Sequence, residues 1–359
     1  MRRTLLPSAA LALAAAIPAQ STLTVGPAGF PSVQAAIDAA SAGDEIVVQP
    51  GSYASFATSK GVTIRAEVPG TVDIAGGGFF ALIAAPPSEP VRLQGLRLGS
   101  YNMLNGRITI EDCTFTSPGI VLGLTFATAH LERVTIEGQP FLIGAQAALV
   151  VNDSVVTMND CTITPEPGGP GSSGTPGIDV NNATLLASNS TISGALGPTA
   201  LPALQLDALS TARLTDCTIV AGANSCGVVG GDVVCSRCTL PASCALPTTT
   251  LLGARANGNV VRGQTYSVTF TGAPNEFLLV FGSNEIDATV AATLQQPFLL
   301  DEVGCFPAAA LLTDANGAAT LDVPVPNMLV PPGIGVYLQG VSGSAFPLLT
   351  SPLVGGVIL

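Results

Sequence analysis

The chain has 359 residues, of which 10% are charged and 5% aromatic, with a formal net charge of −12 at pH 7. Lys60 is the single lysine, so the chain lacks the clustered cations that bind phosphates, which excludes nucleic acid as a partner and disfavours anionic polysaccharides. A hydrophobic content of 47% excludes a disordered chain, and the many Gly, Ala, Val, Leu and Thr residues favour a β-rich, turn-rich protein.

The first 19 residues have the features of a signal peptide. Arg2 and Arg3 form a basic start, residues 5–17 are apolar, and small residues precede position 20. We therefore predict a signal peptide over 1–19 and a mature protein that is secreted or held at the cell surface. No later stretch is long and apolar enough to span a membrane, so we expect no transmembrane segment after signal removal.

The next segment predicts a short capping helix. Val33, Ala36, Ile37 and Ala40 share one helical face, and Ser32 is a suitable N-cap residue. A Gly43-Asp44 turn, an apolar strand over 46–48 and Pro-Gly-Ser-Tyr follow. A cap of this kind covers the open core and the open strand edge of a first coil.

A strand motif then recurs six times, over residues 108–115, 131–136, 158–163, 187–192, 214–219 and 235–240. Its threonines lie 21 to 29 residues apart and are Thr114, Thr135, Thr162, Thr191, Thr218 and Thr239. A period in this range is typical of a solenoid, in which each coil buries its apolar face only against its neighbours.

Apolar and polar residues alternate within each copy, as expected for a strand. Positions six and four before the threonine, and the positions on either side of it, are apolar or small and should form four inward columns. The residues between them, including His130, the single histidine, should face solvent. One extra residue interrupts the alternation and predicts a tight corner, occupied in turn by Asp112, Arg133, Asp160, Asn189, Asp216 and Arg237.

With its capping helix, repeated strands and Asn-type corners, the region from residue 23 to 244 resembles the right-handed parallel β-helix, pectin lyase-like superfamily. The resemblance implies an exported bacterial protein with an all-β fold. We assign the right-handed parallel β-helix to residues 20–246. Residues 247–359 have the pattern of a C-terminal antiparallel β-sandwich, with strands near 266–270, 277–281, 320–325 and 335–341 and a hairpin-type turn at 314–317. This part is similar to C-terminal modules of other secreted bacterial proteins.

The superfamily includes polysaccharide lyases and glycoside hydrolases, but their catalytic signatures have no counterpart here. The chain has no Asp-Asp pair, no His-Gly and no Arg-x-Lys, and no acidic cluster has calcium-ligand spacing. We therefore expect no catalytic residues, no metal site and no cofactor. The corner column places acidic and basic residues in neighbouring coils and is better explained as a structural charge ladder.

Two insertions, at residues 165–177 and 194–202, interrupt the repeat on the same side of the coil. The nearby polar residues Asp179, Asn181 and Asn182 are our candidate binding residues for a polysaccharide or another cell-envelope component. If the protein is an enzyme, a hydrolase or a lyase, its candidate acids are Asp153, Asp179 and Asp207. A third hypothesis is a purely structural surface scaffold.

The cysteines fall into two groups. Cys113 and Cys161 lie in one inward column but two coils apart, about 9.6 Å, beyond the reach of a disulfide. The cysteines near the end of the repeat could form disulfides, and these are Cys217, Cys226, Cys235, Cys238 and Cys244.

Overall fold

A computed structural model describes most of the chain from residue 20 to residue 358. The described ranges are 20–75, 81–118, 121–139, 147–166, 175–195, 201–221, 227–244, 246–247, 249–289, 293–301, 303–327, 334–343 and 347–358. The predicted signal peptide, Cys226 and parts of both insertions lie outside these ranges.

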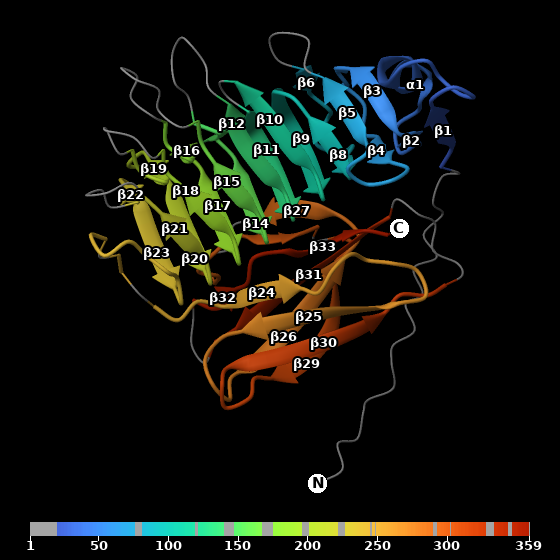
Figure 1. The fold of residues 1–359 in the computed structure, drawn as a ribbon. Helices are drawn as coiled ribbons and strands as arrows, with labels where there is room; N and C mark the ends of the chain where they lie inside the picture. The colour runs from blue at the N-terminus through green and yellow to red at the C-terminus, as the bar shows by residue number, and fades with distance from the viewer. Residues whose placement is uncertain are drawn as a thin grey trace.

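The first part of the chain is a parallel β-solenoid of about eight turns, as the repeat predicts (Figure 1). Its larger sheet contains β1 (Thr22–Val25), β2 (Glu45–Val48), β4 (Thr63–Ala66), β6 (Ala81–Ile83), β7 (Val91–Gln94), β9 (Tyr101–Glu111), β11 (Leu122–Glu132), β13 (Leu149–Asn152), β14 (Val155–Asn159), β16 (Ile178–Asn181), β17 (Thr184–Ser188), β19 (Leu204–Leu206), β20 (Thr211–Thr215), β22 (Val228–Val229) and β23 (Asp232–Ser236). The second sheet contains β3 (Gly51–Ala54), β5 (Val72–Ala75), β8 (Leu96–Leu98), β10 (Thr114–Pro118), β12 (Thr135–Gln139), β15 (Thr162–Thr164), β18 (Thr191–Ser193) and β21 (Thr218–Val220).

The coils stack in the register of the sequence repeat. Thr114 pairs with Thr135, and the same parallel register continues through the later motif threonines. All four inward columns lie in one continuous core, whose last members, Cys238 and Leu240, are partly buried at its end. Each coil thus completes the core of the next, which confirms the prediction from the alternating pattern.

The predicted corner is a left-handed turn in every copy. Asp112, Arg133, Asp160, Asn189, Asp216 and Arg237 have φ between 51° and 54°. Asn and Asp tolerate this conformation better than most residues, and Arg133 and Arg237 are held there by ion pairs. Arg133 Nε lies 2.7 Å from Asp112 Oδ1, and Arg237 Nε lies 2.8 Å from Asp216 Oδ1. The charge ladder therefore connects neighbouring coils.

The capping helix is α1 (Val33–Ala39), and the Ser32 side chain accepts a hydrogen bond from Ala35 N as predicted. The other end of the helix is closed by Lys60. Its Nζ donates hydrogen bonds to Ile37 O, Asp38 O and Ala40 O at 2.8 to 3.1 Å. The single lysine therefore binds carbonyls at the C-terminal end of the helix, where intrahelical donors run out.

The C-terminal part consists of antiparallel sheets around a core of its own. A three-stranded sheet contains β24 (Gly253–Ala256), β25 (Thr265–Thr271) and β30 (Ala318–Pro324). A five-stranded sheet contains β26 (Phe277–Ser283), β29 (Phe306–Leu312), β31 (Gly335–Ser342), β32 (Leu349–Thr350) and β33 (Val354–Val357). A two-stranded sheet consists of β27 (Ile286–Thr289) and β28 (Phe298–Leu300). The turn predicted at 314–317 is present, with Gly317 N donating to Asp314 O, but it connects strands of two different sheets.

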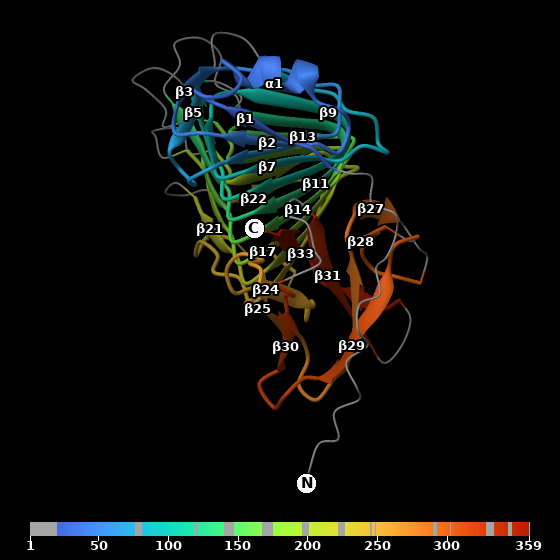
Figure 2. The ribbon, with the colours of Figure 1, turned by 90° about the vertical axis from the view of Figure 1, so that its right-hand side faces the viewer.

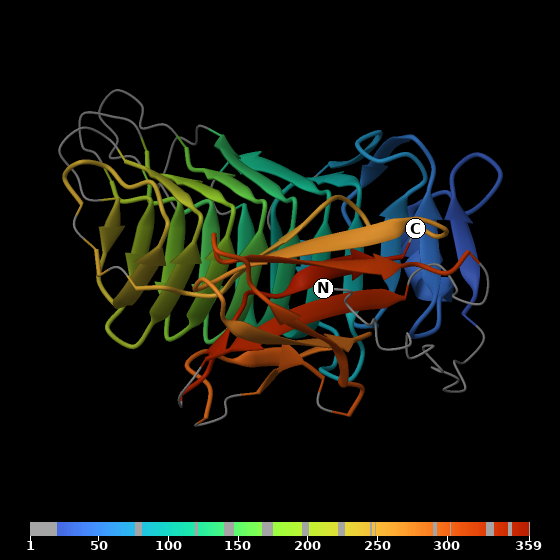
Figure 3. The same ribbon diagram turned by 90° about the horizontal axis from the view of Figure 1, so that it is seen from below.

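The C-terminal sheets lie along one side of the solenoid (Figures 2 and 3). They cover the residues that we expected to face solvent between the inward columns. His130 and Glu132 are 0% exposed, and Thr109, Thr157 and Leu186 are also buried. The expectation of a solvated face was wrong because the alternating pattern shows which residues point away from the solenoid core, not what a later segment places on them.

We predict that Lys60→Met loosens the cap, because three helix carbonyls lose their donor. Amide hydrogen exchange of residues 36–40 should become about tenfold faster, the equivalent of roughly 1.4 kcal/mol. Lys60→Arg is the matched control and should retain most of the protection. Unchanged exchange in Lys60→Met would mean that the lysine does not stabilise the helix.

Candidate functional site

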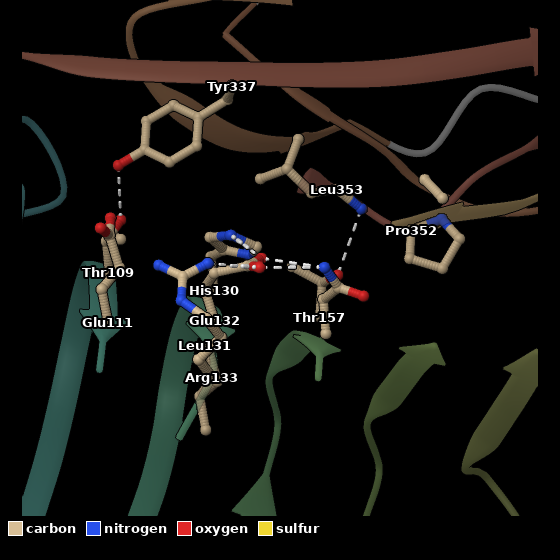
Figure 4. Close-up of polar contacts among 12 residues, drawn as sticks. Thr109, Glu111, His130, Leu131, Glu132, Arg133, Thr157, Tyr337, Pro352 and Leu353 are labelled. Atoms are coloured by element: carbon tan, nitrogen blue, oxygen red, sulfur yellow. Dashed lines mark hydrogen bonds and ion pairs between the residues drawn. The ribbon is translucent and has the colours of Figure 1, made fainter. Parts of the chain in front are cut away.

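A band of buried polar residues lies between the solenoid and the C-terminal sheets (Figure 4). Thr109 Oγ1 lies 2.9 Å from Tyr337 Oη, and Leu353 N donates to Thr157 Oγ1 at 3.3 Å. The imidazole of His130 packs edge-on against the Tyr337 ring, with 5.8 Å between ring centroids. These contacts join residues of the repeat to strands from the other end of the chain.

The charges in this band are paired within the solenoid. Glu132 accepts hydrogen bonds from Arg133 Nη1 at 2.9 Å and from Asn159 Nδ2 at 3.0 Å. His130 Nε2 lies 3.4 Å from Glu132 Oε2, and neither ring nitrogen has a hydrogen-bond partner among the described residues. A histidine beside a carboxylate could serve acid–base chemistry, but this pair is inaccessible to a substrate. We interpret the band as a docking interface.

The interface extends along the solenoid. At one end Arg92 Nη2 lies 3.0 Å from Glu285 Oε1, and at the other Arg237 Nη2 donates to Thr271 Oγ1 at 2.8 Å. Near Arg237 the interface opens into a cleft of about 470 Å³, which is lined by Asn189, Asp216, Ala254, Arg255, Thr269 and Thr271. Asp216 is already bound by Arg237, so the cleft offers few free polar groups to a ligand.

A second polar surface lies on the outer face of β9, β11, β13, β16 and β19, where our candidate binding residues are. Asn102, Gly123, Val150, Asp179 and Gln205 stand in register in one row. Leu104, Thr125, Asn152 and Asn181 stand in register in the next row. We call these two rows the amide strip, because four of their nine members carry side-chain amides.

Two details show how the amides are arranged. Asn181 Nδ2 donates to Asn152 Oδ1 at 3.1 Å, so these two amides are linked across adjacent coils. The Asn102 side chain lies over Gly123, where an added Cβ would be 2.2 Å from Asn102 Oδ1. Asp179 is half-buried, and its carboxylate makes no hydrogen bond or ion pair within the described part of the chain.

The amide strip is bordered by a second column of left-handed corners, which we call the corner ridge. It consists of Asn105, Phe126, Asp153 and Asn182, with φ of 61°, 53°, 47° and 49°. All four are exposed. Asn and Asp are ordinary residues at such corners, whereas a phenylalanine there is an outlier whose backbone is strained by about 1–3 kcal/mol. The Phe126 side chain is 61% exposed, so burial of the ring does not offset this strain.

The candidate catalytic acids have different environments. Asn182 donates through its side chain to Asp153 Oδ1 at 2.6 Å and through its backbone to Asp207 Oδ2 at 3.1 Å. The Ser210 hydroxyl, with the backbone N–H groups of Asn182 and Leu209, lowers the pKa of Asp207. Asp153 and Asp207 are therefore held by hydrogen bonds from the corner residue Asn182, and the lowered pKa of Asp207 makes its carboxyl a poor general acid. Asp179 alone remains without a partner among the described residues.

The cysteines of the predicted disulfide region lie at the end of the solenoid. Cys217, Cys235 and Cys238 have free thiols, as do Cys113 and Cys161 in the core. Cys244 is disulfide-bonded.

Comparisons with known proteins identify no family. No protein-family model matches the chain, and no curated protein matches its sequence. Among solved structures, the chain is similar to full-length tailspike protein 2 of Escherichia coli O157:H7 bacteriophage CAB120, with a TM-score of 0.34 and 10% identity over 94% of this chain. It covers 64% of that tailspike's length. Function must therefore be argued from the surface itself.

The described residues include no helix long and apolar enough to cross a membrane. Within the same residues, no group of three or more His, Cys, Asp and Glu side chains is arranged to hold a metal ion.

Our sequence reasoning missed Phe126 and Asn105, although a signal was available. Asn105-Gly106 and Asp153-Ser154 are turn-type pairs, and alignment of the long strands would have placed Phe126 at the same corner.

We predict that the Thr109–Tyr337 contact couples the two parts of the chain. Tyr337→Phe should lower the free energy of unfolding by about 1–3 kcal/mol, because Thr109 is left buried without its partner. Thr109→Val combined with Tyr337→Phe should cost less than the sum of the single changes. Urea unfolding of the four proteins measures this coupling. Thr320→Val, at an exposed strand position, is the control, and additive single effects would contradict the prediction.

Proposed function

We propose that the protein is an exported surface protein that binds a neutral, hydroxyl-rich polysaccharide along the amide strip and corner ridge, without cleaving it. The observation that carries the proposal is Phe126. Its ring is exposed, and its backbone occupies a conformation that Asn or Asp would adopt with less strain. A strained and exposed aromatic residue lowers stability, and a gain in binding is a physical reason for its presence.

The chemistry of the strip suits sugar hydroxyls. Each side-chain amide offers donors and acceptors, and a hydroxyl group requires both. Side-chain amides lie on the three successive coils of Asn152, Asn181 and Gln205, which are about 4.8 Å apart, and also on the coil of Asn102, and this spread favours an extended ligand over a compact one. Phe126 adds a flat apolar surface beside them, on which the apolar face of a sugar ring can pack.

The charge of the surface selects among polysaccharides. The strip and ridge contain Asp153 and Asp179 but no Lys or Arg. An anionic chain would meet these carboxylates and the net negative charge of the protein, so a neutral polysaccharide is favoured.

The main alternative is a polysaccharide-active enzyme that uses Asp153, Asp179 and Asp207. Asp179 is the observation in its favour, because an unpartnered carboxylate on a polar surface is available for proton transfer. Asp153 and Asp207 are bound by corner residues, which leaves Asp179 without a second free acid among these candidates. A purely structural scaffold is the third hypothesis, and it gives no role to the exposed ring of Phe126.

We predict that Phe126→Asn separates binding from stability. The substitution relieves the backbone strain, so the free energy of unfolding should rise by about 1 kcal/mol. Loss of the ring should weaken binding about tenfold, the equivalent of roughly 1.4 kcal/mol. Affinity electrophoresis in gels containing dextran, β-glucan, mannan or galactomannan measures binding, and urea unfolding measures stability.

Two comparisons make this experiment decisive. Phe277→Ala, which removes a ring that is 57% exposed in the C-terminal sheets, should leave binding unchanged. Polygalacturonate should retard the protein less than the neutral polymers do. Unchanged affinity of Phe126→Asn for a bound neutral polymer, or no retardation by any of them, would contradict the proposal.

We also predict that the protein releases no product from a polysaccharide that it binds. Reducing-end assays test for hydrolysis, and ultraviolet absorbance of unsaturated uronates tests for lyase activity. Release that disappears in Asp179→Asn while polymer retardation persists would establish the enzyme alternative.

A further inference from the structure

The inward column just before the motif threonine contains a pair of facing thiols at the end of the solenoid. Its members are Cys113, Val134, Cys161, Ser190, Cys217 and Cys238. Cys217 and Cys238 alone in this column are cysteines of adjacent coils. Thr215 pairs with Ser236 before them and Thr218 with Thr239 after them, and Thr239 N donates to Cys217 O at 2.9 Å.

This register brings the two cysteines within reach of a disulfide. Neighbouring parallel strands are about 4.8 Å apart, within the Cα separation of about 4.4–6.8 Å that disulfides span. Cys238 Sγ lies 3.4 Å from Leu214 O, so this sulfur reaches toward the preceding coil that contains Cys217. Cys113 and Cys161 are separated by the coil of Val134 and have no such partner.

A third thiol favours the thiolate form of Cys238. Cys235 is buried in the same coil, and the left-handed corner at Arg237 turns the chain so that Cys235 and Cys238 both face the core. Hydrogen bonds from the Cys217 and Cys235 thiols lower the pKa of Cys238, whereas burial raises the pKa of Cys113 and of Cys161 to about 12. Cys238 is also less buried than Cys217, because it lies at the open end of the core.

We propose that Cys217 and Cys238 are a redox-active dithiol that closes to a disulfide by exchange with an oxidised small-molecule or protein disulfide. The Cys238 thiolate attacks one sulfur of that disulfide and expels its first thiol, which forms a mixed disulfide. Cys217 then loses its proton to the solvent and attacks Cys238 Sγ, which expels the second thiol. Two electrons and two protons pass to the exchange partner, and the last two coils become covalently joined.

The position of the pair gives the bond a structural effect. Cys235 N donates to Pro247 O at 3.1 Å, and Thr249 N donates to Cys235 O at 3.2 Å, so the segment leading to the C-terminal sheets pairs with this last coil. A disulfide at Cys217 and Cys238 therefore holds the coil from which the chain crosses to its second part. Oxidation should protect residues 232–240 from local opening.

Limited alkylation of the full-length protein, with the disulfide of Cys244 left intact, tests the order of reactivity among the free thiols of the solenoid. With substoichiometric iodoacetamide at pH 7 and peptide mass mapping, Cys238 should be modified first. Cys113 and Cys161 should react only after denaturation, and they serve as internal controls. Preferential modification of Cys217 or Cys235 would overturn the proposal.

Oxidised glutathione tests the linkage. Peptide mapping of the wild-type protein without reduction should find a Cys217–Cys238 disulfide and no glutathione on Cys113 or Cys161. Cys217→Ser should accumulate glutathione on Cys238, and Cys235→Ser should still form the disulfide. A Cys235–Cys238 linkage, or no new disulfide in the wild-type protein, would contradict the proposal, and neither result depends on whether a variant folds.

Discussion

Register between coils is the constraint on which the whole structure depends. A single coil is too thin to bury its apolar face, so each one depends on neighbours that place matching residues above and below it. The left-handed corners maintain this match, because a slip of one residue would move the inward columns to the outer face. The amide strip, the corner ridge and the thiol pair all consist of residues that this register aligns on successive coils.

The register between coils explains why similar residues have different roles. Asp112 and Asp216 form ion pairs with an arginine one coil away, whereas Asp179 has valine and glutamine as its neighbours in the row. Cys161 is a buried core residue beside Val134, whereas the pKa of Cys238 is lowered by its neighbour Cys217. In each case the occupant of the adjacent coil, more than the residue itself, determines the chemistry.

The solenoid could be read from the sequence because its signals are local and repeated. The alternation, the extra corner residue and the Ser32 cap all follow from spacing along the chain. The burial of His130 could not be predicted in this way, because the ring that covers it, Tyr337, is about 200 residues away and belongs to no repeat. The ridge was overlooked because Phe126 is an atypical corner residue, and its neighbours in the column become evident only when coils of unequal length are aligned.

The length of the C-terminal interface has a consequence for how this protein can change over evolutionary time. Repeats are readily duplicated or lost, since each new coil needs only to match its neighbours. Here, however, the C-terminal sheets contact the solenoid from Arg92 to Arg237, through Glu285 and Thr271. Adding or removing a coil between those points would shift one set of contacts by a full strand spacing. The C-terminal sheets thus constrain the number of repeats between the two contact points.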